Sequence, residues 1–292
     1  MYNFQSYTKA ESVPHAIQLL KENPEARVIA GGTDVLINLH EGKEGFQHLV
    51  DIHDVPDLKQ ITLTETEDIV IGSGTTFAAL AESPVVSERI PMLAEMVFTF
   101  AGPQLRNMAT IGGNLCNGMT SADSAPPLFT LNAVLTLDGA NGRRELPIET
   151  FYKGPGKVTL ESYEVLTAIT ITRDNYLDLH GTYHKYAMRD AMDIATIGCA
   201  ALCRVENDVM EDLRIAYGVA SPVPVRCKKG ETLAKGKKIT KALLTEIAEM
   251  VPDDLSPRNS WRASKDFRLH IIKTLASRVI EKAIIKAGGK IE

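Results

Sequence analysis

Two glycine pairs, each within two residues of a threonine, constrain this 292-residue chain more than any other feature of its sequence. The first pair lies in residues 28–34 (VIAGGTD) and the second in residues 109–114 (ATIGGN). Glycine has no Cβ atom, so successive backbone N–H groups could converge on an anion at each pair, and the threonine hydroxyl adds a donor. A single glycine pair is more often an ordinary turn. The presence of two such pairs in one chain favours a diphosphate site.

Two other phosphate-binding motifs are excluded by single positions. A dinucleotide-binding fingerprint needs three glycines in the pattern GxGxxG, and the best candidate, which begins at Gly72, has Phe77 at the third position. A P-loop that ended at residues 156–157 would need a glycine at Phe151 and a hydroxyl residue at Val158. The chain therefore carries neither of these nucleotide motifs.

The composition is ordinary for a globular protein and excludes several kinds of partner. Hydrophobic residues make up 44% of the chain and charged residues 24%, and the net charge is −5 without a broad basic face. We therefore expect no binding to nucleic acid, which requires a basic footprint. No apolar run approaches the length of a bilayer span, and residues 1–5 lack a charged region that leads into an apolar core. We expect a cytoplasmic protein without a membrane span.

The cysteines and histidines give no sign of a metal centre. The four cysteines, which are Cys116, Cys199, Cys203 and Cys227, form no CxxC pair, and two of them lie in an apolar stretch typical of a core. The seven histidines show no HxH or HxxxH spacing. We therefore expect reduced thiols, no iron–sulfur cluster and no bound metal in this chain.

The order of predicted elements divides the chain into three segments. Residues 1–55 read as a helix that Ser12 caps, a strand at 27–30, the first glycine turn, a short helix and a strand at 48–52. Residues 56–176 contain short strands, helices after residue 76 and at 91–100, a long irregular stretch at 101–127, and a hairpin whose turn is Asn141-Gly142. Residues 177–292 contain three strands and two helices, near 240–250 and 265–286. We expect an α/β subdomain, a second α+β subdomain and an antiparallel sheet backed by helices.

Five stretches together resemble a known family. They are residues 30–34 (AGGTD), 109–114 (ATIGGN), 120–126 (TSADSAP), 185–195 (KYAMRDAMDIA) and 261–264 (WRAS). Their order and spacing resemble the FAD subunits of three-subunit bacterial xanthine dehydrogenases, which are molybdenum hydroxylases, over essentially the whole chain. The medium subunits of CO dehydrogenase and nicotinate dehydrogenase share the two glycine loops, so the resemblance is more specific for the family than for the substrate.

The resemblance implies an α+β fold and a set of cofactor contacts. Two α/β subdomains of the p-cresol methylhydroxylase (PCMH) or vanillyl-alcohol oxidase type would clasp FAD, followed by a C-terminal sheet and helices of the CO dehydrogenase flavoprotein type. Residues 27–34 and 109–113 would cradle the diphosphate, Asp123 would bind a sugar or ribityl hydroxyl, and Lys185 would lie near the flavin. The full set of implied cofactor-binding residues is Arg27, Val28, Ile29, Ala30, Gly31, Gly32, Thr33, Asp34, Phe100, Ala101, Ala109, Thr110, Ile111, Gly112, Gly113, Asn114, Asp123, Val165, Leu166 and Lys185.

Several of these residues have an equally simple structural explanation. Asp34 is as well placed to cap the helix that begins at Val35 as to contact a cofactor. Asp123 lies in a turn-forming sequence, and Lys185 could be a solvated strand residue. Arg189, Asp190 and Asp193 are expected to form an ion-pair network at a strand end, and Cys116 is expected to be a small packing residue.

The resemblance also implies partners and a division of chemistry. FAD would be held non-covalently, while a small subunit carries the [2Fe-2S] clusters and a large subunit carries the molybdenum cofactor. Electrons would pass from the clusters to the flavin and on to NAD⁺, so no residue of this chain need act as a nucleophile or base. Two alternatives remain: a medium subunit that serves nicotinate, another purine, an aldehyde or CO, and an assembly or scaffold protein that has the fold but binds no FAD.

Overall fold

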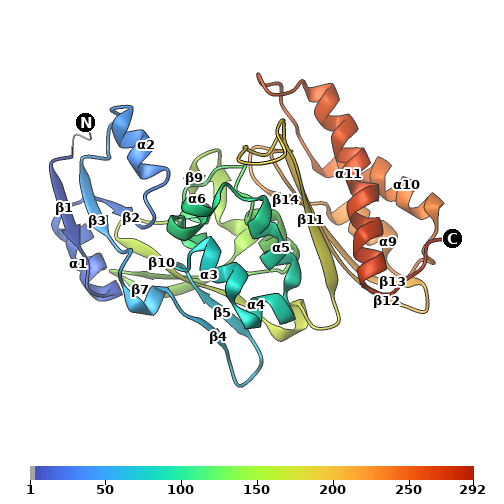
Figure 1. The fold of residues 1–292 in the computed structure, drawn as a ribbon, viewed down its shortest axis with the longest axis horizontal. Helices are drawn as coiled ribbons and strands as arrows, with labels where there is room; N and C mark the ends of the chain where they lie inside the picture. The colour runs from blue at the N-terminus through green and yellow to red at the C-terminus, as the bar shows by residue number, and fades with distance from the viewer. Residues whose placement is uncertain (1–3) are drawn as a thin grey trace.

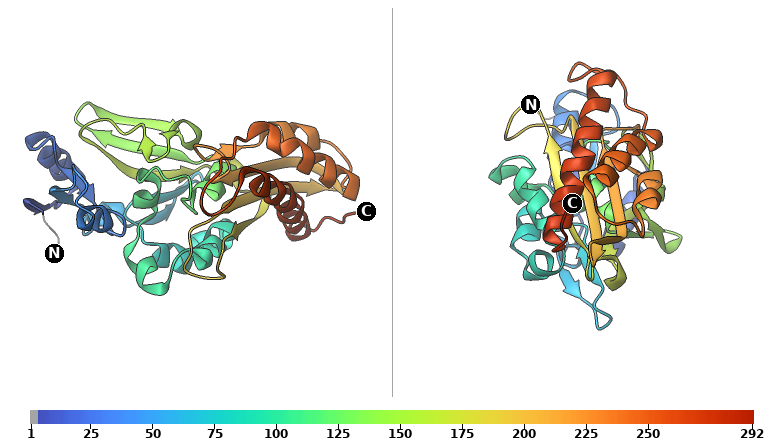
Figure 2. Two further views of the ribbon diagram at one scale, coloured as in Figure 1. Left: turned by 90° about the horizontal axis from the view of Figure 1, so that it is seen from above. Right: turned by 90° about the vertical axis from the view of Figure 1, so that its right-hand side faces the viewer.

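The computed structural model describes residues 4–292, and three β-sheets of three or more strands follow one another along its length (Figure 1). Seen from above, the N-terminal segment, the middle segment and the C-terminal sheet lie in a row (Figure 2). Each sheet falls in one of the three expected segments, although the boundaries near residues 55 and 176 stay a prediction. No helix of the described chain is long and apolar enough to cross a membrane.

The N-terminal segment is a three-stranded parallel sheet, in the order β1-β3-β2, with two helices. Its elements are β1 (Ser6–Lys9), α1 (Val13–Glu22), β2 (Arg27–Ile29), α2 (Val35–His40), β3 (His48–Asp51) and the 3₁₀ helix η1 (Pro56–Leu58). The predicted cap of α1 is confirmed, because the Ser12 side chain accepts a hydrogen bond from the His15 N–H at 3.2 Å. Strand β1 was not predicted, because its four residues are mostly exposed and show no apolar alternation.

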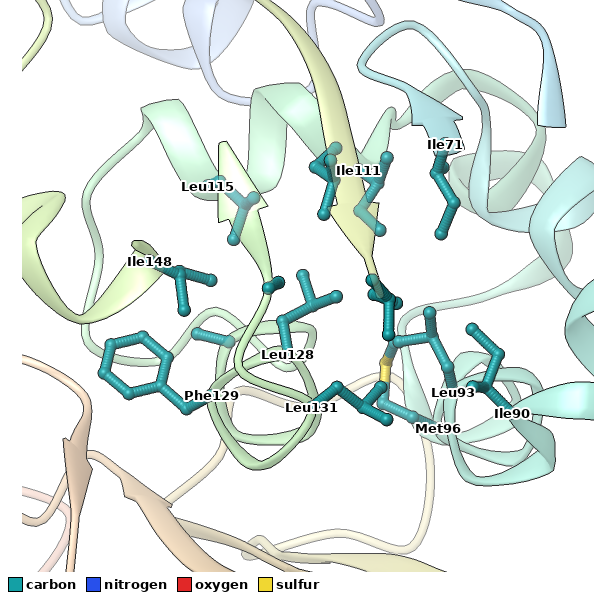
Figure 3. Packing of buried hydrophobic residues seen from close by; sticks show 14 of the residues in the cluster. Ile71, Ile90, Leu93, Met96, Ile111, Leu115, Leu128, Phe129, Leu131 and Ile148 are labelled. Atoms are coloured by element: carbon teal, nitrogen blue, oxygen red, sulfur yellow. The ribbon is translucent and has the colours of Figure 1, made fainter. Parts of the chain in front are cut away.

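The middle segment is an antiparallel sheet in the order β4-β5-β10-β6-β7, covered on one face by short helices (Figure 1). Its strands are β4 (Ile61–Leu63), β5 (Ile69–Gly72), β6 (Val134–Gly139), β7 (Gly142–Pro147) and β10 (Glu164–Ile171), with a separate pair, β8 (Tyr152–Gly154) and β9 (Lys157–Val158). Its helices are α3 (Phe77–Glu82), α4 (Pro84–Arg89), α5 (Pro91–Thr99), α6 (Pro103–Met108), α7 (Ile111–Cys116), α8 (Ala125–Thr130), and the 3₁₀ helices η2 (Ile148–Thr150) and η3 (Arg173–Asn175). The apolar side chains of α5, α7 and α8 meet β5 and β10 in the largest core (Figure 3). The predicted hairpin is confirmed, but Gly139 pairs with Gly142, so its two turn residues are Ala140 and Asn141 and not Asn141 and Gly142.

The expectation of a long irregular stretch at residues 101–127 is wrong. The stretch contains α6 and α7 and the start of α8. Each of these helices has six residues, which is too short for an apolar periodicity to be visible in the sequence. The second glycine pair, Gly112 and Gly113, therefore lies in a helix and not in a turn.

The C-terminal segment is an antiparallel sheet in the order β11-β12-β13-β14, with α9 and α11 packed on it and α10 packed on these two helices. Its elements are β11 (His180–Tyr186), β12 (Ile197–Glu206), β13 (Val209–Gly218), β14 (Val225–Arg226), α9 (Lys228–Ala234), α10 (Lys241–Met250), the 3₁₀ helix η4 (Val251–Asp254) and α11 (Lys265–Lys286). Cys199 and Cys203 lie in this core, as expected. The chain turns away from α11 at Gly288, where φ is +78° and a side chain would be strained.

Two arginines, of which Arg226 is buried, join the C-terminal sheet to the middle segment. Arg226 is paired with Glu231 at 2.5 Å and reaches the Phe129 carbonyl at 3.1 Å and Asn132 Oδ1 at 2.6 Å. Arg214 donates to Asn175 Oδ1 at 2.9 Å. Since the buried charge of Arg226 is paired with a carboxylate, this contact is both polar and fixed in geometry.

Candidate functional site

A cavity of about 1350 Å³ lies between the N-terminal and middle segments. Its walls are the first glycine loop, the start of α7, the beginning of β10 and residues 153–164. Fifteen of the predicted cofactor residues line it: Arg27, Val28, Ala30, Gly31, Gly32, Thr33, Asp34, Phe100, Ala109, Thr110, Gly112, Gly113, Asn114, Val165 and Leu166. The structure therefore brings residues that are far apart in the sequence to one concave surface, large enough for an extended organic cofactor.

The first glycine loop leaves a run of backbone donors free. The N–H groups of residues 31–35 donate no hydrogen bond to any described residue, although they precede and open α2. The N–H groups of Asp34 and Val35 are at the start of a helix, where backbone donors have no partner within the helix. Five successive unpaired N–H groups on a cavity wall are what a diphosphate would satisfy.

Gly31 and Gly32 are required for different reasons. A Cβ atom on Gly31 would lie 1.8 Å from the Met108 carbonyl oxygen, so the first loop packs directly on the backbone that leads into α7. Gly32 has φ +72°, a conformation that side chains rarely adopt. The two loops therefore touch each other, and only glycine permits this approach.

The second glycine pair permits close packing but leaves no backbone N–H group free to bind an anion. The N–H groups of Ile111, Gly112, Gly113 and Asn114 already donate to Thr75, Ser73, the Thr110 side chain and the Thr110 carbonyl. The expectation that these amides converge on an anion is therefore wrong for the helix as it stands. A Cβ atom on Gly112 would lie 2.5 Å from the Ser73 Cβ, so this glycine lets α7 approach the end of β5.

Asp34 does not cap α2 by a side-chain hydrogen bond to any described backbone group. Burial raises the pKa of its carboxyl, and a hydrogen bond with Asn117 opposes this shift. The side chain lines the cavity, and the residue is also exposed to solvent. The simple capping explanation is thus not supported, and Asp34 is an ionisable group beside the free amides.

An aromatic stack fixes the wall formed by Phe100. Its ring lies 4.1 Å from that of Phe77, with an angle of 13° between the planes. Arg106 ties this bend together, because its guanidinium donates to the carbonyls of Phe98, Phe100 and Ala101. Ala101 has φ +42° and does not line the cavity.

Four other predicted residues also lie outside the lining. Ile29 and Ile111 point into the cores, where they are 7% and 0% exposed. Asp123 and Lys185 are paired with each other: Lys185 Nζ lies 2.7 Å from Asp123 Oδ2, and the two side chains are 7% and 5% exposed. The alternative that Lys185 is a solvated strand residue is therefore wrong.

The Asp123–Lys185 pair lies behind the Phe100 wall. Lys185 Nζ also donates to the Thr99 carbonyl at 3.1 Å, and the Tyr183 hydroxyl donates to Asp123 Oδ1 at 2.7 Å. The sequence reasoning missed Tyr183. Its position two residues before Lys185 on the same strand would have placed it on the same face of β11.

Arg27 and residues 153–164 complete the cavity in ways the sequence did not fully predict. Arg27 Nε donates to the Gly45 carbonyl at 2.7 Å, and its guanidinium lies 5.1 Å from the centre of the Phe46 ring. It therefore holds the loop that closes one end of the cavity. Residues 153–164 were not predicted as lining, and the Gly154-Pro155-Gly156 turn was the only signal for them.

The cavity has no metal-binding or nucleophilic character. No cluster of three or more metal-ligating side chains occurs in residues 4–292. Burial raises the pKa of the Cys116 thiol, which borders the cavity, to about 12, so it is not a reactive thiolate. Beyond the C-terminal end of β11, Asp193 accepts hydrogen bonds from the Met188 and Arg189 amides, and Arg189 Nη2 lies 3.6 Å from Asp193 Oδ1, so the expected network is present for Arg189 and Asp193 but does not include Asp190.

Comparison with known proteins assigns both halves of the chain to protein families. Residues 2–173 match the FAD binding domain in molybdopterin dehydrogenase, and residues 182–283 match the CO dehydrogenase flavoprotein C-terminal domain. The match to the first of these families covers more than half of the 292 residues.

Individual relatives match over nearly the full length. The xanthine dehydrogenase FAD-binding subunit of Escherichia coli O157:H7 is 47% identical, with 100% of both chains covered. The carbon monoxide dehydrogenase medium chain of Hydrogenophaga pseudoflava is 30% identical, over 95% of this chain and 96% of that protein. A solved structure of carbon monoxide dehydrogenase from Hydrogenophaga pseudoflava, which lacks the Mo-pyranopterin moiety of its molybdenum cofactor, superposes with a TM-score of 0.93 at 28% identity and covers 98% of this chain and 99% of that chain.

Proposed function

This chain belongs to the FAD-binding family of the molybdopterin dehydrogenases, and from that premise we propose that it is the flavin-carrying subunit of a xanthine dehydrogenase. The observation that carries the proposal is the cavity between the glycine loop at residues 31–35 and the glycine-containing start of α7. The relative at 47% identity supports xanthine as the substrate of the complex. The same family includes subunits that serve CO, and medium subunits for nicotinate are an alternative.

The residues present fit FAD. Five unpaired backbone N–H groups at residues 31–35 match the charge and length of a diphosphate, and the glycines at 31 and 112 keep the two walls close. Thr110 and Asn114 add polar groups on the opposite wall, while Phe100 and Leu166 offer apolar surface. We expect non-covalent binding, because no histidine or cysteine of the lining is suited to attach a flavin: Cys116 is a protonated thiol.

When bound, FAD supplies the redox chemistry, since a flavin can take up electrons singly and release a pair as hydride to NAD⁺. The protein's own residues bind, orient and shield. The free amides hold the diphosphate, Arg27 keeps the closing loop in place, and the Phe77–Phe100 stack makes one wall rigid. Lys185 and Asp123 fix the backbone at Thr99, immediately before that wall.

We infer that the complex contains a small subunit with [2Fe-2S] clusters and a large subunit with the molybdenum cofactor. Substrate oxidation would occur on the large subunit, because the described residues of this chain hold no nucleophile–base pair or metal cluster at the cavity. NAD⁺ as acceptor and a cytoplasmic location are part of the same proposal. Five unpaired amides on a cavity wall favour a protein that binds an anionic cofactor over a scaffold that has lost FAD.

The first experiment tests the cofactor. The full chain is stripped of flavin and titrated with FAD, FMN and riboflavin, with flavin fluorescence as the readout. FAD should bind at least about tenfold more tightly than FMN, because the amides are arranged for a diphosphate. Acid precipitation should release the flavin. Equal affinity for riboflavin and FAD would contradict the diphosphate site, and flavin retained by the precipitated polypeptide would contradict non-covalent binding.

The second experiment tests the partners. The chain is co-expressed with candidate small and large subunits, and the purified complex is assayed with xanthine, hypoxanthine and nicotinate while NAD⁺ reduction is followed. Xanthine should reduce NAD⁺ in the complex and not with this chain alone. Xanthine turnover by the isolated chain would refute the assignment, and turnover of nicotinate in place of xanthine would support the alternative substrate.

A further inference from the structure

One side chain of the flavin cavity is buried and has no partner. Ser73 directly follows β5 and lines the cavity, and the residue is 3% exposed. Its Oγ atom makes no hydrogen bond with any described residue. Within residues 4–292, no other residue that lines the cavity has a buried side-chain oxygen or nitrogen without a partner. A buried hydroxyl without a partner costs free energy, so this one calls for an acceptor.

The backbone of Ser73 fixes the place of this side chain. Its N–H donates to the Thr167 carbonyl at 3.0 Å, and its carbonyl accepts a hydrogen bond from the Gly112 N–H at 2.8 Å. A Cβ atom on Gly112 would lie 2.5 Å from the Ser73 Cβ. The Ser73 side chain therefore lies directly against Gly112 at the start of α7, where both residues line the cavity.

The wall formed by α7 lacks a backbone donor for an anion. The N–H groups of residues 111–114 are all bonded within the protein, whereas those of residues 31–35, on the other wall, are free. Because Ser73 lies against Gly112, its hydroxyl supplies a donor on the α7 side of the cavity. A serine hydroxyl hydrogen turns about the Cβ–Oγ bond, so it is able to point at an acceptor that enters the cavity.

The other polar side chains of this wall already have partners. Thr110 Oγ1 accepts a hydrogen bond from the Gly113 N–H at 3.1 Å. Asn114 Oδ1 accepts one from the Ser124 hydroxyl at 2.6 Å. Among these three side chains, Ser73 is therefore the one whose hydrogen-bonding capacity is wholly unused by the described chain.

Thr75 is a natural comparison for Ser73. It lies two residues further along the chain and is 1% exposed, and its Oγ1 atom is also buried without a partner among the described residues. Its carbonyl accepts a hydrogen bond from the Ile111 N–H at 2.9 Å, so it too is joined to α7. Thr75 does not line the cavity. The two hydroxyls therefore differ chiefly in their position relative to the cavity.

We propose that the Ser73 hydroxyl donates a hydrogen bond to the diphosphate of the cofactor and makes the cavity selective for a flavin that carries phosphate. This inference rests on the proposed function, because the ligand is the FAD assigned to the cavity. The free amides of residues 31–35 hold the diphosphate from the N-terminal wall, and Ser73 holds it from the wall of α7. Ser73 is a binding residue that the glycine motifs did not reveal, since it lies outside both of them.

The test compares Ser73→Ala with Thr75→Val in the flavin-stripped full chain. FAD and riboflavin are titrated into each variant, with flavin fluorescence as the readout. Ser73→Ala should weaken FAD binding by about tenfold or more, because a hydrogen bond to a charged group is lost. It should change riboflavin affinity by less than about twofold, because riboflavin carries no phosphate. Thr75→Val keeps the shape of the side chain and should leave both affinities within about twofold of the wild type.

Two further measurements separate binding from a structural role. The flavin-free Ser73→Ala chain should unfold within about 2 °C of the wild type, because the hydroxyl has no internal partner to lose. The rise in Tm that a fixed concentration of FAD produces should be smaller in this variant than in the wild type. In phosphorus NMR spectra of the FAD-loaded chain, Ser73→Ala should shift a resonance of the diphosphate, and Thr75→Val should not.

The outcomes distinguish this proposal from the preceding one. If the wild type prefers FAD to riboflavin and Ser73→Ala binds FAD as well as the wild type, the role of Ser73 is overturned and the flavin assignment stays intact. An equal loss for FAD and riboflavin would also overturn it, because the hydroxyl would then act on the shape of the cavity. A marked fall in the Tm of the flavin-free Ser73→Ala chain would assign the hydroxyl to internal packing instead. A wild type that binds FAD no more tightly than riboflavin would overturn both proposals.

Discussion

Replacement of Lys185 by Met deletes the charge that balances a buried carboxylate. Asp123 and Lys185 are 5% and 7% exposed, and their charged atoms lie 2.7 Å apart. Methionine has a similar length and an apolar stem, so the variant leaves little empty space. The Tyr183 hydroxyl still donates to Asp123 at 2.7 Å, but a neutral donor does not compensate the charge.

Breaking such a pair from one side costs about 3 to 5 kcal/mol, because an uncompensated charge stays buried. For a chain of this size that corresponds to a fall in Tm of roughly 10 °C. The double variant Asp123→Asn/Lys185→Met removes both charges and keeps an acceptor for Tyr183. It should recover most of the loss, so the coupling energy between the two sites should be at least about 2 kcal/mol.

The loss should depend on pH in a defined direction. Burial raises the pKa of Asp123, and Lys185 opposes that shift in the wild type. Without Lys185 the folded-state pKa rises further above the unfolded value, so the folded variant holds a proton that the unfolded chain has released. The free energy of unfolding of Lys185→Met should therefore fall, relative to wild type, as the pH rises from about 4 to about 8.

The assay is urea unfolding of the FAD-free chain at several pH values, with far-UV circular dichroism as the readout. Lys238→Met is the matched control, because Lys238 pairs with Glu292 at the surface, where both side chains are about 60% exposed. It should change the free energy of unfolding by less than about 1 kcal/mol. A loss below 1 kcal/mol in Lys185→Met, or additive costs in the double variant, would refute the account of this pair.

Three further outcomes are expected. Gly31→Ala should abolish FAD binding in a fluorescence titration, because its Cβ would lie 1.8 Å from a backbone oxygen. Gly113→Ala should keep measurable binding, because the nearest contact of its Cβ is the Thr110 hydroxyl at 2.9 Å. Stronger FAD binding by Gly31→Ala than by Gly113→Ala would contradict the packing described. FAD affinity should rise as the pH falls from neutral towards the raised pKa of Asp34, because burial raises this pKa and a bound diphosphate would raise it further, and Asp34→Asn should flatten this dependence. Arg226→Met should lower the free energy of unfolding by about 3 to 5 kcal/mol in urea titrations, since it leaves Glu231 buried and unpaired at the joint between the middle and C-terminal segments; a near-neutral effect would mean that the joint depends on apolar packing.

The sequence predicted the regular elements well where the signal was local. The cap at Ser12, the hairpin near Asn141 and the helix at 265–286 are each encoded within a few turns or one strand pair. The short helices at residues 103–116 were missed, because six residues are too few for a period of 3.6 to repeat. Helices of that length depend on tertiary packing, as the contact of Gly112 with Ser73 illustrates.

The candidate site was likewise predicted where the signal was local and missed where it depended on contacts between distant residues. Glycine pairs and the family resemblance identified most of the lining, but they could not reveal which amides would remain unpaired. That distinction depends on whether Ser73 and Thr75 approach α7 from another part of the chain. The Asp123–Lys185 contact joins residues 62 apart in sequence, so each residue was identified separately and their mutual neutralisation was not foreseen.

The backbone N–H groups of one glycine loop are hydrogen-bonded within the protein and those of the other are not, so the two loops should differ in the rate of hydrogen exchange. The amides of residues 111–114 are already bonded within the protein, so their deuterium uptake should be slow whether or not the cofactor is present. The amides of residues 31–35 have no internal acceptor, so they should exchange rapidly in the apoprotein and become protected only on loading. The core around α7 would then be fully formed in the apoprotein. The N-terminal loop would be the part of the chain that becomes ordered and protected when the cofactor binds.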